Sequence, residues 1–172
     1  MLLRTDCPSW LYPVTMGATT IWERWDSMLA DGRLNPGDML SFNHYALGAV
    51  GDWLHRVVGG LAPVDAGYRT VLVAPRPGGG LSHARVVHET AYGRIGVAWH
   101  RAQGRLIVFV DLPVGVTATV RLPDPEWREV VVDHGSHRFE CPFRRPEEDP
   151  ERPAPPQPLG LPPEGESGVF EN

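Results

Sequence analysis

The sequence has no lysine, few cysteines and no long hydrophobic run. All 16 of its Lys and Arg residues are arginine, which suggests the nucleotide composition of the gene rather than a function. Cys7 and Cys141 lie far apart, and neither has a partner at metal-ligand spacing, so free thiols are expected rather than a disulfide framework. The N-terminus has no apolar signal-peptide core, and no apolar run approaches the length of a membrane span. We therefore expect no membrane partner and a cytoplasmic location for this chain, while the location of a longer parent stays open.

Charge and proline are concentrated at the C-terminal end. Residues 146–172 hold eight prolines, seven acidic residues and one arginine. Such a segment has too few bulky apolar side chains to form a core, so we predict a disordered and dispensable tail. Residues 1–145 carry 14 acidic residues against 15 arginines. This near-neutral balance gives no indication of a nucleic-acid partner.

Helical periodicity marks the first part of the chain, to about residue 66. Apolar residues recur at spacings of one, three and four between residues 20 and 29, which predicts a helix. A clearer helix is predicted over residues 41–58, where Gly59 and Gly60 follow as helix-ending residues. Its apolar stripe, which we expect to be buried, consists of Phe42, Tyr45, Ala46, Ala49, Val50, Trp53, Leu54 and Val57.

Short β-branched runs separated by turn residues follow. Predicted strands cover residues 69–74, 84–90, 94–100, 105–111, 117–122, 129–132 and 137–139. Their spacing of roughly eight to twelve residues indicates a β-sandwich. Hairpins are expected at 92–93, 103–104 and 133–135, and the glycine run at 77–80, which lacks the Lys-Ser/Thr of a phosphate loop, predicts a further hairpin connection. Helices followed by strands indicate an α+β chain in separate sequence blocks, at 1–66 and 67–145.

Among the acidic residues, Glu23 stands out because it lies between Trp22 and Trp25. Flat aromatic faces pack well against the C–H face of a sugar ring, so this arrangement is compatible with a glycan site. A capping role is also open, because Thr20 and Glu23 have the spacing of a capping box at a helix start. Four of the six tryptophans lie in the first 53 residues: Trp10, Trp22, Trp25 and Trp53.

His44 falls off the apolar stripe of the predicted second helix. It either faces a cavity or forms a structural hydrogen bond, and the spacing alone leaves both interpretations open. The other six histidines show no zinc-ligand spacing. Neither a metal site nor a cofactor is therefore expected.

Three segments together resemble the closing part of bacterial α-L-rhamnosidases: residues 8–12 (PSWLY), 17–25 (GATTIWERW) and 41–50 (SFNHYALGAV). The resemblance continues through residues 51–54 (GDWL) and into the strand region, at 92–93 (YG) and 97–99 (VAW). It covers about residues 1–143 and leaves only the tail without a counterpart.

The resemblance implies the end of a six-hairpin (α/α)6 barrel over residues 1–66, followed by an antiparallel β-sandwich. The implied reaction is the inverting hydrolysis of terminal α-L-rhamnosyl residues in a rhamnose-containing glycan or glycoside, without cofactor or metal. Motif match gives Glu23 the place of the general base and His44 a substrate-binding place. Trp22 and Trp25 flank the base and are expected to shape the sugar pocket.

The extent of the resemblance matters, because the family's general acid lies upstream of the matching segment. Asp26 is only about one turn from Glu23 on a helix, too near for an inverting pair. We therefore expect this chain to be inactive alone, with the remainder of the barrel upstream or in another chain, and the apolar stripe left uncovered. Two alternatives stay open: a fragment of another glycosidase on the same barrel, or a non-catalytic carbohydrate-binding or scaffold module.

Overall fold

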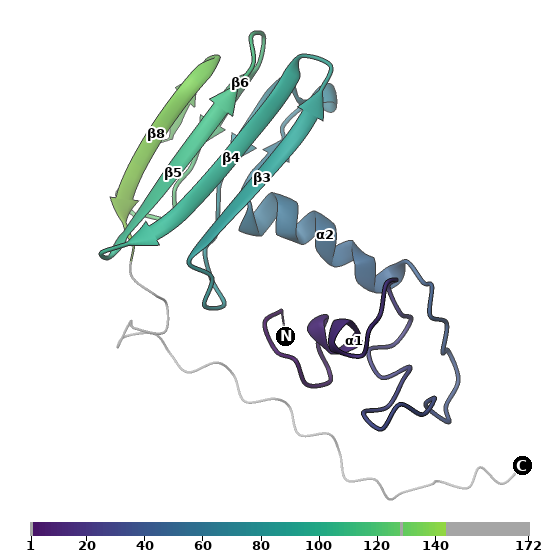
Figure 1. Cartoon of the computed structure of the whole chain (residues 1–172). Helices are drawn as coiled ribbons and strands as arrows, with labels where there is room; N and C mark the ends of the chain where they lie inside the picture. The colour runs from purple at the N-terminus through teal and green to yellow at the C-terminus, as the bar shows by residue number, and fades with distance from the viewer. Residues whose placement is uncertain (1, 128, 144–172) are drawn as a thin grey trace, which may run out of the picture.

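The computed structural model describes residues 2–127 and 129–143, so the predicted tail at 146–172 lies outside the described residues. Figure 1 shows an N-terminal part with little regular structure, a helical segment, and a β-sandwich beyond it. None of the described helices is long and apolar enough to cross a membrane.

The helical segment consists of three consecutive pieces with different pitch. A 3₁₀ turn (η1, Ala46–Ala49) leads into an α-helical turn (α2, Val50–Trp53) and a π-helical turn (η2, Leu54–Val58). The helix predicted over residues 41–58 therefore ends where expected but begins five residues late. The only other α-helical piece in the described chain is α1, Leu11–Thr15.

The helix predicted over residues 20–29 is wrong. This stretch consists of bends and turns, with one isolated bridge between Met28 and Leu34. It begins with β-branched Thr20 and Ile21, and so short a helix has little stability without tertiary packing. Its backbone instead pairs with residues 41–44, where the His44 N–H donates to the Ile21 carbonyl at 2.8 Å. The same pairing explains why residues 41–44 are not helical.

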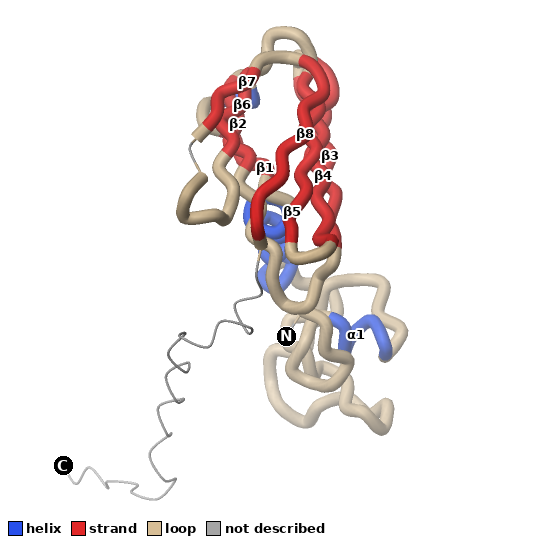
Figure 2. The backbone as a smooth tube through the Cα atoms, turned by 90° about the vertical axis from the view of Figure 1, so that its left-hand side faces the viewer, coloured by secondary structure: helices blue, strands red, loops and turns tan. Residues whose placement is uncertain are grey.

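Within the described residues, eight strands form two four-stranded sheets that face each other (Figure 2). One sheet has the order β1-β2-β6-β7 and the other β3-β4-β5-β8. Neighbouring strands are antiparallel except for β2 and β6, which are parallel. The strands are β1 Leu61–Pro63, β2 Thr70–Val73, β3 His83–Thr90, β4 Gly93–Ala102, β5 Arg105–Leu112, β6 Thr117–Val120, β7 Val130–Val132 and β8 Gly135–Pro142; a 3₁₀ turn, η3 (Ala66–Tyr68), precedes β2.

Each of the seven predicted strands is present, which confirms the sandwich. The prediction missed β1, which pairs with β2 and so extends the sheet to before residue 67. Hairpins join β3 to β4 and β4 to β5, the latter through Gln103 and Gly104, both with positive φ. The segments at 77–80 and 133–135 were wrongly predicted as hairpins, because each leads from one sheet to the other.

The sandwich core comes from the inward-facing residues of both sheets. On β5 the alternation is clear: Leu106, Val108 and Val110 are fully buried while their neighbours are more exposed. Cys141 lies in the same core, and burial raises the pKa of its thiol to about 11, so the thiol stays protonated at neutral pH. Burial of this core is the main contribution to the stability of the sandwich.

The helical segment joins the sandwich through a tight junction. The Trp99 indole N–H donates to the Val58 carbonyl at 2.7 Å, which satisfies a group at the helix end. Gly59 follows, and a Cβ there would lie 2.9 Å from the Cβ of Val86. Gly60 has φ +84°, and a Cβ on it would lie 2.4 Å from the Pro75 nitrogen. Only glycine allows the chain to pass this close to the sandwich.

The apolar stripe is uncovered over most of its length, as expected for this chain alone, whereas the burial expected from its periodicity is wrong there. Leu54 and Val58 pack against the sandwich core, but Tyr45 is 86% exposed and Trp53 is 47% exposed. Phe42 is half-buried. The segment meets the sandwich only with its C-terminal end, as Figure 1 shows, so its earlier turns present apolar side chains to solvent.

Gly60→Ala tests the junction. The substitution should lower the free energy of unfolding by about 1–2 kcal/mol for the positive φ and by about 1–3 kcal/mol more for the contact with Pro75. Gly104→Ala is the matched control, since Gly104 also has positive φ (+71°) but open space around its Cβ position. Urea denaturation measures both; equal losses would contradict a tight junction at Gly60.

Candidate functional site

Glu23 lies on a short two-stranded pairing rather than on a helix. Its backbone N–H donates to the Ser41 carbonyl at 2.8 Å, and the Ser41 N–H donates to Glu23 Oε2 at 3.0 Å. Thr20 Oγ1 also donates to the Phe42 carbonyl. No helix begins at Thr20, so the capping interpretation of Glu23 is wrong. The carboxylate is instead anchored by one oxygen to the facing segment.

His44 stands next to the free side of that carboxylate. Its Nε2 lies 3.8 Å from Glu23 Oε1. The His44 side chain is 30% exposed and the Glu23 side chain is 16% exposed. The Ala46 N–H donates to His44 Nδ1 at 3.2 Å, so Nδ1 acts as an acceptor. In a neutral imidazole the proton is then on Nε2, the nitrogen that faces Glu23. The structure thus brings together the two polar residues that the sequence singled out.

The gap between Glu23 and His44 determines what the pair can do. At 3.8 Å the atoms are too far apart for a good hydrogen bond. Oε2 is occupied by the Ser41 N–H, whereas Oε1 has no hydrogen-bond partner among the described residues. Oε1 can therefore accept a proton or a hydrogen bond from a water or a hydroxyl group, and His44 can donate to the same molecule. Tyr45 stacks on His44 with a centroid distance of 4.9 Å.

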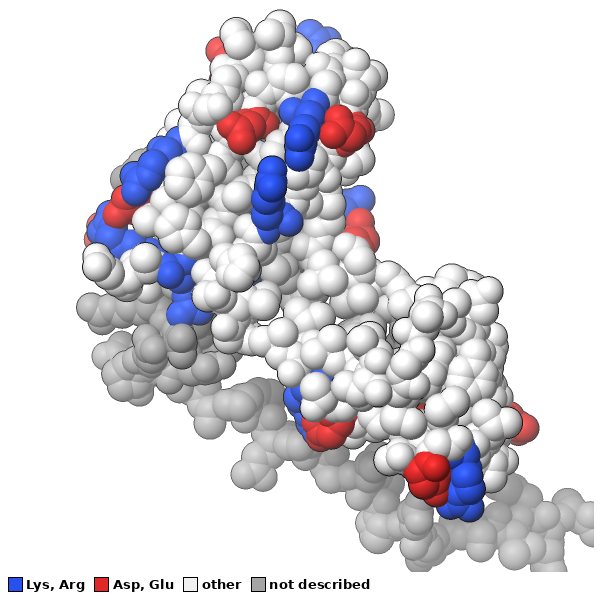
Figure 3. All heavy atoms as spheres, viewed as in Figure 1, with Lys and Arg blue, Asp and Glu red and all other residues white. Residues whose placement is uncertain are grey.

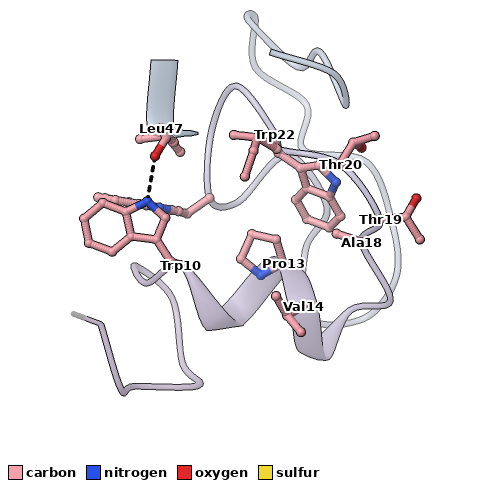
Figure 4. A pocket seen from close by; sticks show the side chains of 10 residues that line it. Trp10, Pro13, Val14, Ala18, Thr19, Thr20, Trp22 and Leu47 are labelled. Atoms are coloured by element: carbon pink, nitrogen blue, oxygen red, sulfur yellow. Dashed lines mark hydrogen bonds between the residues drawn. The ribbon is translucent and has the colours of Figure 1, made fainter. Parts of the chain in front are cut away.

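Trp22 and Trp25 line a different space. They form part of a cavity of about 280 Å³ with Trp10, Leu47 and residues of α1 (Figure 4). Glu23 and His44 are not among the residues that line it. Trp22 is only 4% exposed and packs edge-on against Phe42. The structure does not place the two tryptophans in one pocket with Glu23, and their substrate-binding role stays a prediction.

This cavity has contacts that the sequence did not indicate. The Trp10 indole N–H donates to the Leu47 carbonyl at 2.9 Å, drawn as the dashed line in Figure 4. Trp10 and Trp25 meet edge-on at a centroid distance of 5.5 Å. The Trp25 Nε1 is buried and has no partner among the described residues. Residues this far apart in sequence gave no periodic signal that could have linked them.

The Asp26 carboxylate is held by two neighbouring residues of the loop, Arg24 and Asn35. Arg24 forms a two-pronged ion pair with it, with both N–O distances at 3.0 Å. The Asn35 side-chain amide donates to Asp26 Oδ2 at 2.9 Å and to the Asp26 carbonyl at 3.1 Å. These contacts hold the loop in shape and occupy the carboxylate, as expected for a residue without a catalytic role.

The comparisons identify the family. Residues 1–58 match the family model of the bacterial α-L-rhamnosidase six-hairpin glycosidase domain, and residues 60–137 match that of the bacterial α-L-rhamnosidase C-terminal domain. The chain belongs to the bacterial α-L-rhamnosidase family. The α-L-rhamnosidase of Streptomyces avermitilis is 41% identical over 136 residues, which cover 79% of this chain and 13% of that protein. An α-L-rhamnosidase from Formosa agariphila is 37% identical over 134 residues, which cover 78% of this chain and 14% of that protein.

Solved structures of the family have the same fold. The native α-L-rhamnosidase of Aspergillus terreus superposes with a TM-score of 0.76 at 45% identity, covering 81% of this chain and 16% of that one. The Streptomyces avermitilis enzyme complexed with L-rhamnose superposes with a TM-score of 0.72 at 38% identity, and the match covers 81% of this chain and 15% of that one. The chain thus spans only 13% to 16% of the length of these relatives.

Glu23→Ala tests the anchoring of the carboxylate. Loss of the acceptor for the Ser41 N–H should lower the free energy of unfolding by about 0.5–1.5 kcal/mol and speed hydrogen exchange at the Ser41 amide. Glu23→Gln keeps an acceptor oxygen and should change both far less. NMR-detected exchange in Glu89→Ala, a change at an exposed strand residue, is the control. Unaltered Ser41 exchange in Glu23→Ala would refute the contact.

Proposed function

We propose that this chain is the C-terminal part of an α-L-rhamnosidase that cleaves terminal α-L-rhamnosyl residues with inversion, and that Glu23 is its general base. The observation that carries the proposal is the Glu23 carboxylate, held through Oε2 by the Ser41 N–H and open at Oε1 toward His44. A carboxylate fixed on one side and free on the other is suited to take a proton from an attacking water.

In this mechanism each residue has a distinct role. Glu23 removes a proton from the water that attacks the anomeric carbon on the face opposite the leaving oxygen. His44 donates through Nε2–H to a sugar hydroxyl or to the water, which keeps the substrate next to Oε1. An inverting pair needs its acid about 6.5–9.5 Å from the base. The nearest sequence candidate, Asp26, is engaged by Arg24 and Asn35, so the acid would come from outside this chain.

The substrate in this proposal is a rhamnose-containing glycan or glycoside. The homologue from Streptomyces avermitilis has been crystallised with L-rhamnose, and Glu23 and His44 lie within the part of this chain that matches the six-hairpin domain. Trp22 and Trp25, which flank Glu23 in sequence and line the neighbouring cavity, would help to shape the sugar pocket.

The remainder of the barrel has a suitable surface to pack on. An apolar groove of about 870 Å³ runs between the N-terminal segment, the helical segment and the β2–β3 connection. Trp53 and Val50 line it, and the exposed ring of Tyr45 comes just before the same helical segment. Exposed apolar patches often mark interaction sites. The residues that line the groove are Leu2, Leu3, Arg4, Trp10, Ala49, Val50, Trp53, Val58, Arg76, Gly78, Gly79 and Leu81.

A chimaeric enzyme tests the role of Glu23. Residues 1–143 would replace the matching segment of the Streptomyces avermitilis enzyme, and turnover of p-nitrophenyl α-L-rhamnoside would be compared with that of its Glu23→Gln variant. Loss of the base should lower turnover by about 10² to 10⁴ with an unchanged melting curve. His44→Ala should mainly raise KM, and Glu89→Gln is the control. Near-normal turnover in Glu23→Gln would exclude it as the base.

The chain alone should not release rhamnose from the same substrate, because inversion needs both carboxyl groups. Its exposed apolar groove should make it self-associate, and Trp53→Glu should shift the species seen by light scattering toward the monomer. Rhamnose release by a monodisperse monomer, abolished by Glu23→Gln, would contradict the need for a further segment. A non-catalytic role would instead be favoured if the chimaera binds rhamnosides but never turns them over.

A further inference from the structure

The outer face of the β3-β4-β5-β8 sheet carries features that the proposed catalytic function does not use. This face points away from the other sheet (Figure 2) and toward the viewer in Figures 1 and 3. Figure 3 shows basic and acidic side chains next to one another across it. Along each strand these outward residues alternate with those of the core, so they are free of a packing role.

A hollow of about 180 Å³ lies on this face, over strands β3, β4 and β5. It is lined by Arg85 and Val87 on β3, by Arg94, Gly96, Val97 and Ala98 on β4, and by Asp111 on β5. In the strand register Gly96 pairs with Val87 on one side and Asp111 on the other. A Cβ at Gly96 would stand 3.6 Å from Asp111 Oδ2. The missing side chain therefore leaves room for a group to approach that oxygen.

The hollow presents hydrogen-bond donors and an acceptor that keep free bonding capacity among the described residues. The Arg85 side chain is exposed and makes no ion pair or hydrogen bond among the described residues. Arg94 has only a distant, exposed pairing with Glu89, at 3.8 Å. Asp111 accepts from Ser136 Oγ at 2.6 Å through Oδ1, which fixes the carboxylate and leaves Oδ2 toward Gly96.

An aromatic surface adjoins these polar groups. Phe109 lies opposite Ala98 in the register and is 38% exposed. The His100 ring stacks beside it at a centroid distance of 5.8 Å and an interplanar angle of 22°. Phe109, opposite the lining residue Ala98, therefore places a partly exposed aromatic ring next to the hollow. Flat aromatic faces with adjacent hydrogen-bonding groups are suited to amphipathic rings that are apolar on one face and polar at the rim.

Charge determines which class of ligand fits. The two arginines are balanced by Glu89 and Asp111 on the same face, so the hollow has no excess of one sign that would select an anion. An arginine and a carboxylate that both keep free hydrogen-bonding capacity match the donor and acceptor character of sugar hydroxyl groups.

We propose that this hollow binds a neutral sugar ring of a glycan, with Arg85 and Asp111 on neighbouring hydroxyls and Phe109 against the C–H face.

This site is separate from Glu23 and would hold the sandwich on a glycan while the catalytic part acts elsewhere on it. The test uses the full chain in NMR titrations with three probes: L-rhamnose, D-galactose and D-galacturonate. At least one neutral sugar should saturate with a Kd below about 10 mM and shift the amides of Gly96, Ala98 and Asp111. Arg85→Gln should weaken that binding about tenfold or more.

Control variants separate the alternatives. Gly96→Val should also abolish binding by filling the hollow, without strain because Gly96 lies in a strand with ordinary φ. Arg69→Gln removes the same charge from another exposed position and should leave the affinity unchanged. The readout is the amide shifts of Gly96, Ala98 and Asp111, which do not report on Glu23, so failure of the catalytic proposal would leave this one intact. Binding of galacturonate alone, shifts confined to Glu23 and His44, or no saturation by either neutral sugar would each overturn the proposal.

Discussion

The arrangement of this molecule depends on the close approach of one helix end to the sandwich core. The Trp99 indole reaches from the core to the Val58 carbonyl, so the last turn of the helical segment is fixed by a side chain that is itself fully buried. Gly59 and Gly60 then turn the chain into β1 with no room for a side chain against Val86 and Pro75. The direction of the helical segment, and with it the position of the N-terminal part, therefore follows from the packing of the sandwich. The π-helical turn at Leu54–Val58 lies at this junction, where the Gly59 N–H bonds back to Leu54.

The candidate site depends on a second constraint, the pairing of two loop segments. Residues 21–23 and 41–44 have no regular structure of their own, but they exchange backbone hydrogen bonds across a gap of about 20 residues in sequence. This pairing places Glu23 and His44 side by side, whereas Trp22 lines the cavity with Trp10 and Leu47. A carboxylate on a loop is held more precisely when it takes part in the pairing itself, as that of Glu23 does with Ser41.

The sandwich and the helical segment differ in how completely their apolar side chains are covered. The sandwich has a continuous buried core, and its outer face carries charges of both signs around the hollow at Gly96. The helical segment instead leaves Tyr45 and Trp53 uncovered beside an apolar groove. One domain is thus complete in its packing while the other lacks partners for its apolar side chains. The boundary between these two parts agrees with the two family models, which adjoin at residues 58 and 60: one of a six-hairpin glycosidase domain and one of a C-terminal domain.

The sandwich could be predicted from the amino-acid sequence, because period-two alternation and turn residues are local signals that each strand carries within a few residues. The family resemblance and the selection of Glu23 and His44 as candidates came from short contiguous motifs. Three features depend instead on the tertiary fold: residues 20–29 form no helix, two connections cross between the sheets, and Trp22 lines a cavity without Glu23. In each case the deciding contacts lie far apart in sequence, such as Glu23 with Ser41 or Trp99 with Val58. Local helix propensity is weaker than such long-range hydrogen bonding and burial. A segment with a helical pattern therefore adopts another conformation where a distant segment offers better hydrogen-bond partners.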